Sequence, residues 1–353
     1  MNRNLYSAEG GDTKKSLPKD INISKRSSNI ELLRIIAITF VLILHTRFEG
    51  LMPLYNSELT FGNICCFAFE SFAIVGVNVF VMISGYFGIK LSGRSISKYC
   101  FQVYYFAIIA MLILWMVGDF SIGKEQVIKL LFPISHNVWF VPCYFILMLL
   151  APMLNSYIER TSLRKLLGYT ILIYSVTYVW GNVFQNGYGF GGYSWGFFIV
   201  LYLFGAIIRK WNQNHTTSIA MALIGYILFS IMIVGIAILQ IRYDFGRSLL
   251  WSYDSPLVLA SSTCLFLFFS NLKVKYNKWI NFLGASTLAV LLFHILPGSN
   301  YSEFHKLIYN SMSGIQVIGF SAIVVVAYFI AAVLIDQPRK FIFNRLSKIK
   351  RSK

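Results

Sequence analysis

The chain has 353 residues, of which 57% are hydrophobic and only 13% charged, and its formal net charge is +17. A soluble domain carries about 25% charged residues, so this composition excludes an ordinary globular enzyme. The apolar residues form blocks of about 17 to 25, long enough to cross about 30 Å of hydrocarbon. They lack the two-residue alternation of a β-barrel, which leaves helices as the spanning structure. The sequence therefore predicts an all-α, polytopic membrane helix bundle.

Ten transmembrane helices are predicted in chain order, at residues 32–47, 64–89, 99–117, 138–155, 166–184, 195–208, 218–241, 256–271, 280–296 and 315–335. Residues 1–28 are polar and basic and are expected to form a disordered cytoplasmic arm. Residues 29–338 form the predicted membrane domain, and residues 339–353 a basic cytoplasmic tail. Asp336, followed by Pro338 and Arg339, is expected to end the last helix, because proline cannot continue a helix easily.

Lysine and arginine predict the orientation of the bundle, because they stay preferentially on the cytoplasmic side of short loops. Of the 31 basic residues, 24 lie in segments that fall on one side of the predicted spans. Both termini are therefore expected in the cytoplasm. The positive charge then reflects topology and attraction to anionic headgroups of the lipid bilayer, and no nucleic acid is expected as a partner. The five cysteines are scattered without paired spacing, so neither disulfides nor a metal site is expected.

Two ionisable residues in the first span are the strongest clue to function. Arg34 and His45 are eleven positions apart, so they share a helical face about 16 Å apart along the axis. Arg34 lies near the predicted cytoplasmic boundary and His45 in the outer half. His294 and Glu70 are predicted at a depth similar to that of His45. Ionisable groups in lipid are costly and usually functional.

The residues predicted at these depths suit general-base catalysis on a substrate that carries phosphate. A neutral histidine with a carboxylate partner can act as a general base at neutral pH, which gives His45 and Glu70 catalytic roles. The guanidinium of Arg34 suits phosphate groups. The alternatives are that the histidine bonds a neighbouring helix and that the arginine extends to the headgroups.

Four stretches carry a family resemblance. Residues 29–37 followed by His45 resemble the first-helix signature of the acyltransferase-3 family, integral membrane acyltransferases that include bacterial surface-glycan O-acetyltransferases. Residues 77–87, the stretch from Trp139 to Pro152, and Ser286 through His294 agree in order. The resemblance covers residues 25–345 and includes the ten-helix layout.

The resemblance implies transfer of an acyl group, usually acetyl from cytoplasmic acetyl-CoA, to a hydroxyl of a glycan. By the same resemblance His45 is the essential histidine and Arg34 its partner. Where many members carry an arginine-rich stretch entering the third helix, this chain has Lys90, Arg94, Lys98 and Gln102. We expect no extracytoplasmic hydrolase-like domain, so transfer finishes in the bundle or on a glycan-assembly partner protein.

Further residues are expected to bind the donor or the acceptor. Ser84, Gly85 and Tyr86 reach the cytoplasmic rim near Arg34 and, with Lys90 and Lys98, are candidates for the donor site; the alternative for Ser84 and Gly85 is close helix packing. The candidates for binding the acceptor are Trp139, Trp195 and His294. Aromatic faces can stack on sugar rings, and the alternative is an interfacial aromatic belt.

The sequence thus predicts an O-acyltransferase of the bacterial cytoplasmic (inner) membrane, most simply an O-acetyltransferase, acting on a surface polysaccharide or its lipid-linked precursor. His45 fits two roles, general base or transient acyl carrier. The main alternative is a transporter or flippase for lipid-linked sugars, which would also use intramembrane arginine and histidine but would not need CoA. A glycan polymerase or a structural subunit fits the charge pattern less well.

Overall fold

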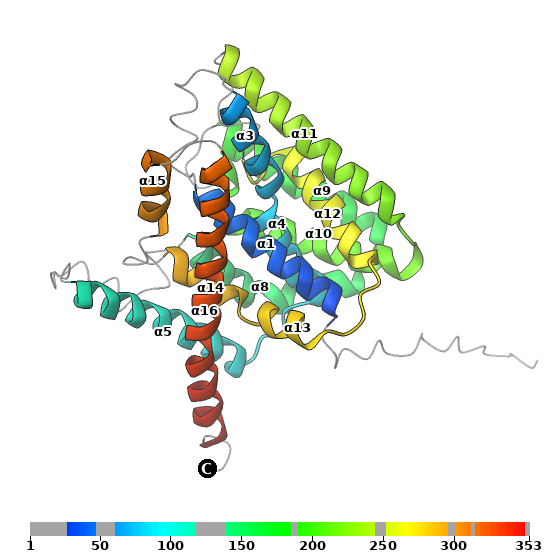
Figure 1. Cartoon of the computed structure of the whole chain (residues 1–353). Coiled ribbons are helices and arrows are strands. Elements are labelled where there is room, and N and C mark those ends of the chain that lie inside the picture. Colours follow the sequence, from blue (N-terminus) through cyan, green and yellow to red (C-terminus); the bar gives the residue numbers. More distant parts are fainter. Residues whose placement is uncertain are drawn as a thin grey trace, which may run out of the picture.

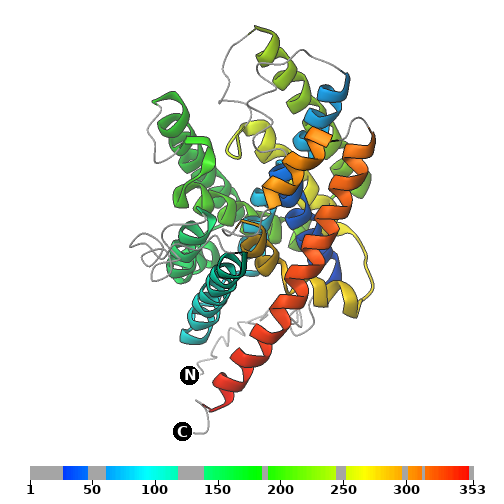
Figure 2. The same ribbon diagram turned by 60° about the vertical axis from the view of Figure 1, so that its left-hand side comes forward.

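The computed structural model describes residues 27–46, 61–117, 139–184, 190–243, 252–295, 301–311 and 315–349. The regular secondary structure in these ranges is helical, and no strand occurs in them (Figures 1 and 2). The predicted all-α polytopic bundle is confirmed. The basic arm predicted at residues 1–28 lies almost entirely outside the described residues, so it stays a prediction.

The helices run in chain order as α1 (Ser28–Thr46), α3 (Phe61–Ala73), α4 (Gly76–Phe87), α5 (Gly93–Val117), α8 (Phe140–Arg160), α9 (Leu163–Tyr178), α10 (Trp195–Asn214), α11 (Ile219–Tyr243), α12 (Pro256–Asn271), α13 (Lys278–Gly284), α14 (Thr287–Ile295), α15 (Tyr301–Ser311) and α16 (Ile315–Ile349). Two short turns, η1 (Val179–Val183) and η2 (Phe190–Gly192), lie between α9 and α10. Every predicted span has a helical counterpart. Seven described helices are long and apolar enough to cross a membrane, or eight if α13 and α14 count as one span bent by 40°. The full count of ten stays a prediction.

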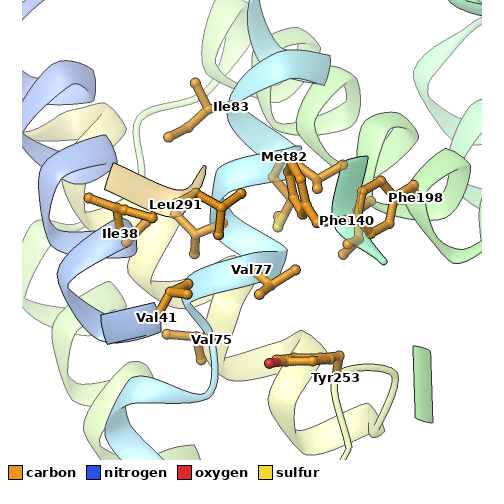
Figure 3. Close-up of a cluster of buried hydrophobic side chains, with 14 of the residues drawn as sticks. Ile38, Val41, Val75, Val77, Met82, Ile83, Phe140, Phe198, Tyr253 and Leu291 are labelled. Carbon is orange, nitrogen blue, oxygen red and sulfur yellow. The ribbon is translucent and has the colours of Figure 1, made fainter. Parts of the chain in front are cut away.

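Helix α4 lies at the centre of the bundle and packs against α1, α10 and α12. Its sequence is apolar on every side, as expected of a helix surrounded by protein. Figure 3 shows its side chains Val77 and Met82 between two groups, Ile38 with Leu291 and Phe140 with Phe198. The one buried amide on α4, Asn78, donates to the carbonyl oxygen of Tyr253 at 2.7 Å. The helix is therefore fixed on both sides.

Glycines set the distance between α4 and its neighbours. A Cβ atom at Gly85 would overlap the backbone carbonyl of Tyr202 on α10, and one at Gly205 on α10 would overlap the carbonyl of Met82. At the start of α4, a Cβ atom at Gly76 would lie 2.6 Å from the carbonyl oxygen of Ala37 on α1. Small residues let membrane helices approach this closely, and dispersion contacts then stabilise the pair.

The start of α1 is fixed by polar contacts to two other helices. The hydroxyl of Ser28 accepts hydrogen bonds from the backbone nitrogen of Asn277 at 2.9 Å and from the amide of Asn281 at 3.1 Å. The amide of Asn29 donates to the carbonyl of Phe269 at 2.9 Å. The start of α1, the end of α12 and the start of α13 thus lie on one side of the bundle. This grouping agrees with the predicted alternation of the spans, and the assignment of this side to the cytoplasm stays a prediction.

The predicted end of the last helix at Asp336 is wrong. Helix α16 continues through Pro338 to Ile349, and its last part extends beyond the other helices in both views (Figures 1 and 2). Proline removes one backbone donor and crowds the preceding turn. Side-chain donors bind carbonyls close to the proline: the hydroxyl of Tyr105 on α5 donates to the carbonyl of Ile335 at 3.1 Å. The side chain of Gln337 also donates to the carbonyl of Val333 at 2.6 Å.

The ninth predicted span is broken rather than continuous. Helix α13 ends at Gly284 and α14 begins at Thr287, with the pair bent by 40°. The Thr287 hydroxyl donates to the carbonyl of Gly284 at 3.1 Å, which satisfies a backbone group at the break. We call residues 284–287 the α13–α14 break. It lies beside α1, because the side chain of Glu31 fills the space that a Cβ atom of Gly284 would take.

A substitution tests the central helix contact. We expect Gly85→Ala to lower the stability of the purified protein by about 1–3 kcal/mol, because the added methyl must push α4 away from the Tyr202 backbone. Gly235→Ala on α11 is the matched control, since nothing lies within 4 Å of its Cβ position. The measurement is thermal unfolding in detergent. Equal midpoints for the two variants would contradict the close contact.

Candidate functional site

Two histidines meet in the interior of the bundle. The imidazole rings of His45 on α1 and His294 on α14 have centroids 4.9 Å apart and meet edge to face at 74°. Each Nδ1 donates to the carbonyl oxygen four residues earlier, at 2.8 Å to Val41 and 2.9 Å to Val290. In a neutral imidazole only one nitrogen carries the proton, so the lone pair lies on Nε2 in both rings. The structure thus brings together the two histidines that depth alone placed in one layer.

Glu70 belongs to the same half of the bundle. Its side chain is buried on α3, and α3 packs along α1. The contact between Gly76 and the α1 backbone at Ala37 gives a common reference for depth. Glu70 lies six residues before Gly76, which is about 9 Å along the helix axis. His45 lies about 12 Å beyond Ala37 along α1, in the same direction across the bundle. Its role as the carboxylate that orients a histidine stays a prediction.

Arg34 lies at the other end of the same α1 face. Its guanidinium Nη1 is 3.5 Å from the Oε1 of Glu31, and the arginine side chain is 24% exposed while that of Glu31 is buried. Because Glu31 lies against Gly284, this ion pair borders the α13–α14 break. Arg34 thus forms an ion pair with a buried carboxylate, while part of its own side chain remains exposed. That geometry suits an arginine that binds an anionic ligand.

Ser84 lies in the same layer as Arg34. Its hydroxyl is 2.9 Å from the hydroxyl of Tyr144 on α8. Arg34 is an electrostatic neighbour of the same tyrosine. Tyr144 was not singled out in the sequence, although it follows Pro142 by two positions in the Trp139 stretch. Its contact with Ser84 depends on how α8 is rotated about its axis, which the sequence does not show.

The other predicted donor residues have different surroundings. Gly85 is occupied by the packing contact with α10, which is the alternative considered for it. The ring of Tyr86 packs on Phe266 with centroids 5.3 Å apart. Lys90 and Lys98 are exposed at the predicted cytoplasmic end, after α4 and in the first turns of α5. These two lysines could contact a ligand only at the rim.

A polar ring that the sequence did not predict ends α4. The backbone nitrogen of Ile89 donates to the Tyr202 hydroxyl at 2.8 Å, and that hydroxyl donates to the Oδ1 of Asn155 at 2.6 Å. The Asn155 amide closes the ring by donating to the carbonyl of Ile89 at 2.9 Å. Gly88 adopts a φ of 75° beside this ring, a conformation that favours glycine. Arg209 reaches the same place, with its Nη1 3.7 Å from the Cβ position of Gly88.

Trp139 anchors an aromatic cluster at the opposite end of the bundle. Its ring stacks on Tyr253 at 5.8 Å and meets Tyr193 edge to face at 4.6 Å. Tyr193 is 42% exposed, whereas Tyr253 is buried, and the two rings meet edge to face at 5.3 Å. The structure therefore places Trp139 on a ring surface that a sugar could stack on. Trp195 is half exposed at the start of α10 and has no ring contact among the described residues.

A buried aspartate, Asp254, directly follows Tyr253 of that cluster. The carboxylate of Asp254 accepts hydrogen bonds from the Ser252 hydroxyl and from the Asn182 amide, both at 2.7 Å. The Tyr174 hydroxyl donates to the backbone carbonyl of Asp254 at 2.8 Å. Burial raises the pKa of Asp254, while the hydrogen bonds from Ser252 and Asn182 oppose that shift. Asp254 thus joins the end of α9 to the segment before α12.

A further histidine, which is fully buried, was not predicted. His305 lies on α15, and α15 packs against α1 and α16. Burial lowers the pKa of His305 to about 4. The only signal in the sequence is the amphipathic pattern of residues 301–311, which places His305 and Ile308 on one face.

The fold and these positions together define a multi-pass membrane protein with ionisable groups buried in its helices. A comparison with family models identifies the family: the acyltransferase-3 model, described as an acyltransferase domain, matches residues 27–335. The chain belongs to this family, and it is a membrane acyltransferase. A search of curated proteins and a search of solved structures each found no match.

The histidine on α15 gives a pH-dependent prediction. Because its folded pKa is lowered from 6.5 to about 4, the docking of α15 is fully stable above about pH 6.5 and weakens as the pH falls toward 4. We expect amide hydrogen exchange in residues 301–311, corrected for its intrinsic pH dependence, to be faster at pH 5 than at pH 7. In His305→Gln this difference should disappear. A pH dependence that is equal in both proteins would contradict the assignment.

Proposed function

We propose that this protein is an O-acyltransferase, most simply an O-acetyltransferase. It moves an acyl group from cytoplasmic acyl-CoA to a hydroxyl of a surface polysaccharide or its lipid-linked precursor. The membrane is the bacterial cytoplasmic membrane. The observation that carries this proposal is the contact between His45 on α1, which is partly buried, and His294 on α14, which is buried; Arg34 lies on α1 eleven residues before His45. The family supports the acyl transfer itself.

His45 is the proposed general base. With Nδ1 donating to Val41, its Nε2 has the lone pair needed to take the proton from the acceptor hydroxyl. The hydroxyl oxygen then bonds to the thioester carbonyl carbon, the carbon–sulfur bond breaks, and the proton passes to the leaving thiolate. His294, whose ring centroid lies 4.9 Å from that of His45, is proposed to orient the acceptor, and Glu70 to supply negative charge in the same half of the bundle.

The proposed donor site is formed by the layer at the predicted cytoplasmic end. Acyl-CoA supplies the activated thioester and carries several phosphates. Arg34 is partly exposed and backed by Glu31, and Ser84 with Tyr144 lines the same layer. A guanidinium held in this way fits a phosphate group, which it can bind through two parallel hydrogen bonds. Lys90 and Lys98 add positive charge at the rim.

The proposed acceptor surface is the aromatic cluster around Trp139. Its rings offer flat apolar faces, and the exposed hydroxyl-bearing ring of Tyr193 offers a polar edge. Sugars present both kinds of surface, so a glycan is the acceptor class that this cluster suits. A glycan-assembly protein could deliver that acceptor from the same side.

The first test compares surface glycans from cells with the intact gene, with a deletion, and with His45→Ala. We expect the mass of one acyl group per modified sugar to be absent in the deletion. In His45→Ala acylation should fall by about 10²–10⁴-fold, the usual contribution of a general base. His215→Ala is the matched control, because His215 is exposed and stacks on Trp211 at the end of α10.

The results of this test distinguish a general base from an acyl carrier, and an acyltransferase from a flippase. Normal acylation in a correctly inserted His45→Ala protein would rule out His45 as the base. An acyl group trapped covalently on His45 would instead identify it as an acyl carrier. Unchanged glycans together with accumulated lipid-linked precursors in the deletion would favour a flippase, and the buried layer would then be a translocation path.

A further inference from the structure

A charged cluster on α16 lies just beyond the residues that match the family. Arg339 is 1% exposed and Asp336 is fully buried, and the Nε of the arginine is 2.5 Å from the aspartate Oδ1. The ammonium of Lys340 is 3.1 Å from the Oδ2 of the same aspartate and is 25% exposed. The family match ends one residue earlier, at Ile335. We call Asp336, Arg339 and Lys340 the α16 cluster.

The α16 cluster has more positive than negative charge, and two of its three members, Asp336 and Arg339, are buried. Among the described residues, Asp336 is the one acid that pairs with Arg339. One carboxylate therefore faces two cations. A buried charge without a full complement of partners is strongly destabilising, so such a cluster is expected to have a further anion.

Arg339 also has a hydrogen-bond donor, its Nη1 group, that could bind such an anion. A guanidinium has five N–H groups arranged for planar acceptors. In the described part of the chain, Nε is used by Asp336, whereas Nη1 is buried and has no hydrogen-bond partner. A buried donor on a charged group costs more when it is unsatisfied than an ordinary amide does. The orphan nitrogen and the excess charge therefore point to the same missing anion.

The position of the cluster relates it to the donor layer. The Lys340 ammonium donates to the Ser286 hydroxyl at 2.6 Å, and Ser286 lies in the α13–α14 break. Glu31, the partner of Arg34, lies against Gly284 in the same break. Figure 1 shows α16 passing beside α14 with α13 and the start of α1 close by, and α14 and α16 are in contact. Lys340 of α16 thus contacts the break directly, and Arg34 of α1 is linked to it through Glu31.

We propose that Arg339 Nη1 and Lys340 Nζ form a binding site for a phosphate group, between α16 and the α13–α14 break. The guanidinium holds the phosphate through directed hydrogen bonds, and the partly exposed lysine lies where the ligand enters. This site rests on the proposed function in one respect: the phosphates of acyl-CoA are the ligand that its position next to Arg34 favours. The phosphate of an anionic phospholipid headgroup has the same chemistry.

The test measures binding directly rather than catalysis. The full chain is purified in a maltoside detergent, which contains no phosphate, and its thermal unfolding is followed with CoA, with inorganic phosphate or with phosphatidylglycerol. A ligand that binds only the folded state raises the unfolding temperature in proportion to its affinity. The variants are Arg339→Gln and Arg339→Lys. Arg345→Gln is the matched control, because it removes the same charge from an exposed position on the same helix.

We expect at least one phosphate-bearing probe to stabilise the wild type and Arg345→Gln alike. Arg339→Gln should bind that probe about ten- to a hundredfold more weakly, the usual effect of losing a charge-assisted hydrogen bond. Arg339→Lys should bind with intermediate strength, because it keeps the charge and loses the fork. A difference confined to CoA identifies the acyl donor as the source of the phosphate, and one confined to phosphatidylglycerol identifies a lipid headgroup. Equal binding of all three probes by Arg339→Gln and Arg345→Gln would overturn the site.

Loss of folding in Arg339→Gln would not prevent the test. The double variant Asp336→Asn/Arg339→Gln removes both buried charges together and so avoids an unpaired aspartate. We expect it to fold and to lose the same binding. His45→Ala separates this site from the proposed reaction, since it should lose acylation but keep the stabilisation by CoA. If the glycans of the deletion strain were unchanged, the proposed function would fail while the phosphate measurement would still decide the α16 cluster.

Discussion

The architecture depends on how closely α4 can approach its neighbours. Membrane helices gain no hydrophobic driving force from leaving lipid, so their association relies on contact between well-fitting surfaces. Gly85 and Gly205 allow the backbones of α4 and α10 to touch, and Gly76 does the same for α4 and α1. Because α4 is fixed on both sides, α1 has a defined rotation and depth. That rotation decides where His45 and Arg34 point.

One helix then carries both halves of the proposed chemistry. At one end of α1 the imidazole of His45 meets that of His294, and both rings keep their Nε2 lone pairs because Nδ1 donates to the backbone. At the other end Arg34 is held by a buried glutamate beside the α13–α14 break. A rigid helix keeps these groups about 16 Å apart, so a donor bound at one side must reach inward to the histidines. The α16 cluster adds two cations beside the same break, because Lys340 donates to the Ser286 hydroxyl.

Much of this plan follows from the sequence, for physical reasons. Helical rise is constant, so depth could be calculated, and depth placed His45 and His294 in one layer. Rotation about each helix axis is set by tertiary packing, so the bond between Ser84 and Tyr144 and the partners of Asp254 could not be predicted. The same limit explains the two local errors. Proline was expected to end α16, but the helix continues to Ile349, with Tyr105 of α5 bonded to its backbone near the proline. The ninth span breaks where Glu31 occupies the space beside Gly284.

The most direct test of the account is acyl transfer by the purified protein in liposomes. Acetyl-CoA labelled in the acetyl group would be supplied as donor, and glycan extracted from the deletion strain as acceptor. The account predicts that label appears on the glycan with the wild-type protein and with His215→Ala, and that His45→Ala leaves it in acetyl-CoA. Label on the glycan at the wild-type rate with His45→Ala would contradict the central role of the histidine pair.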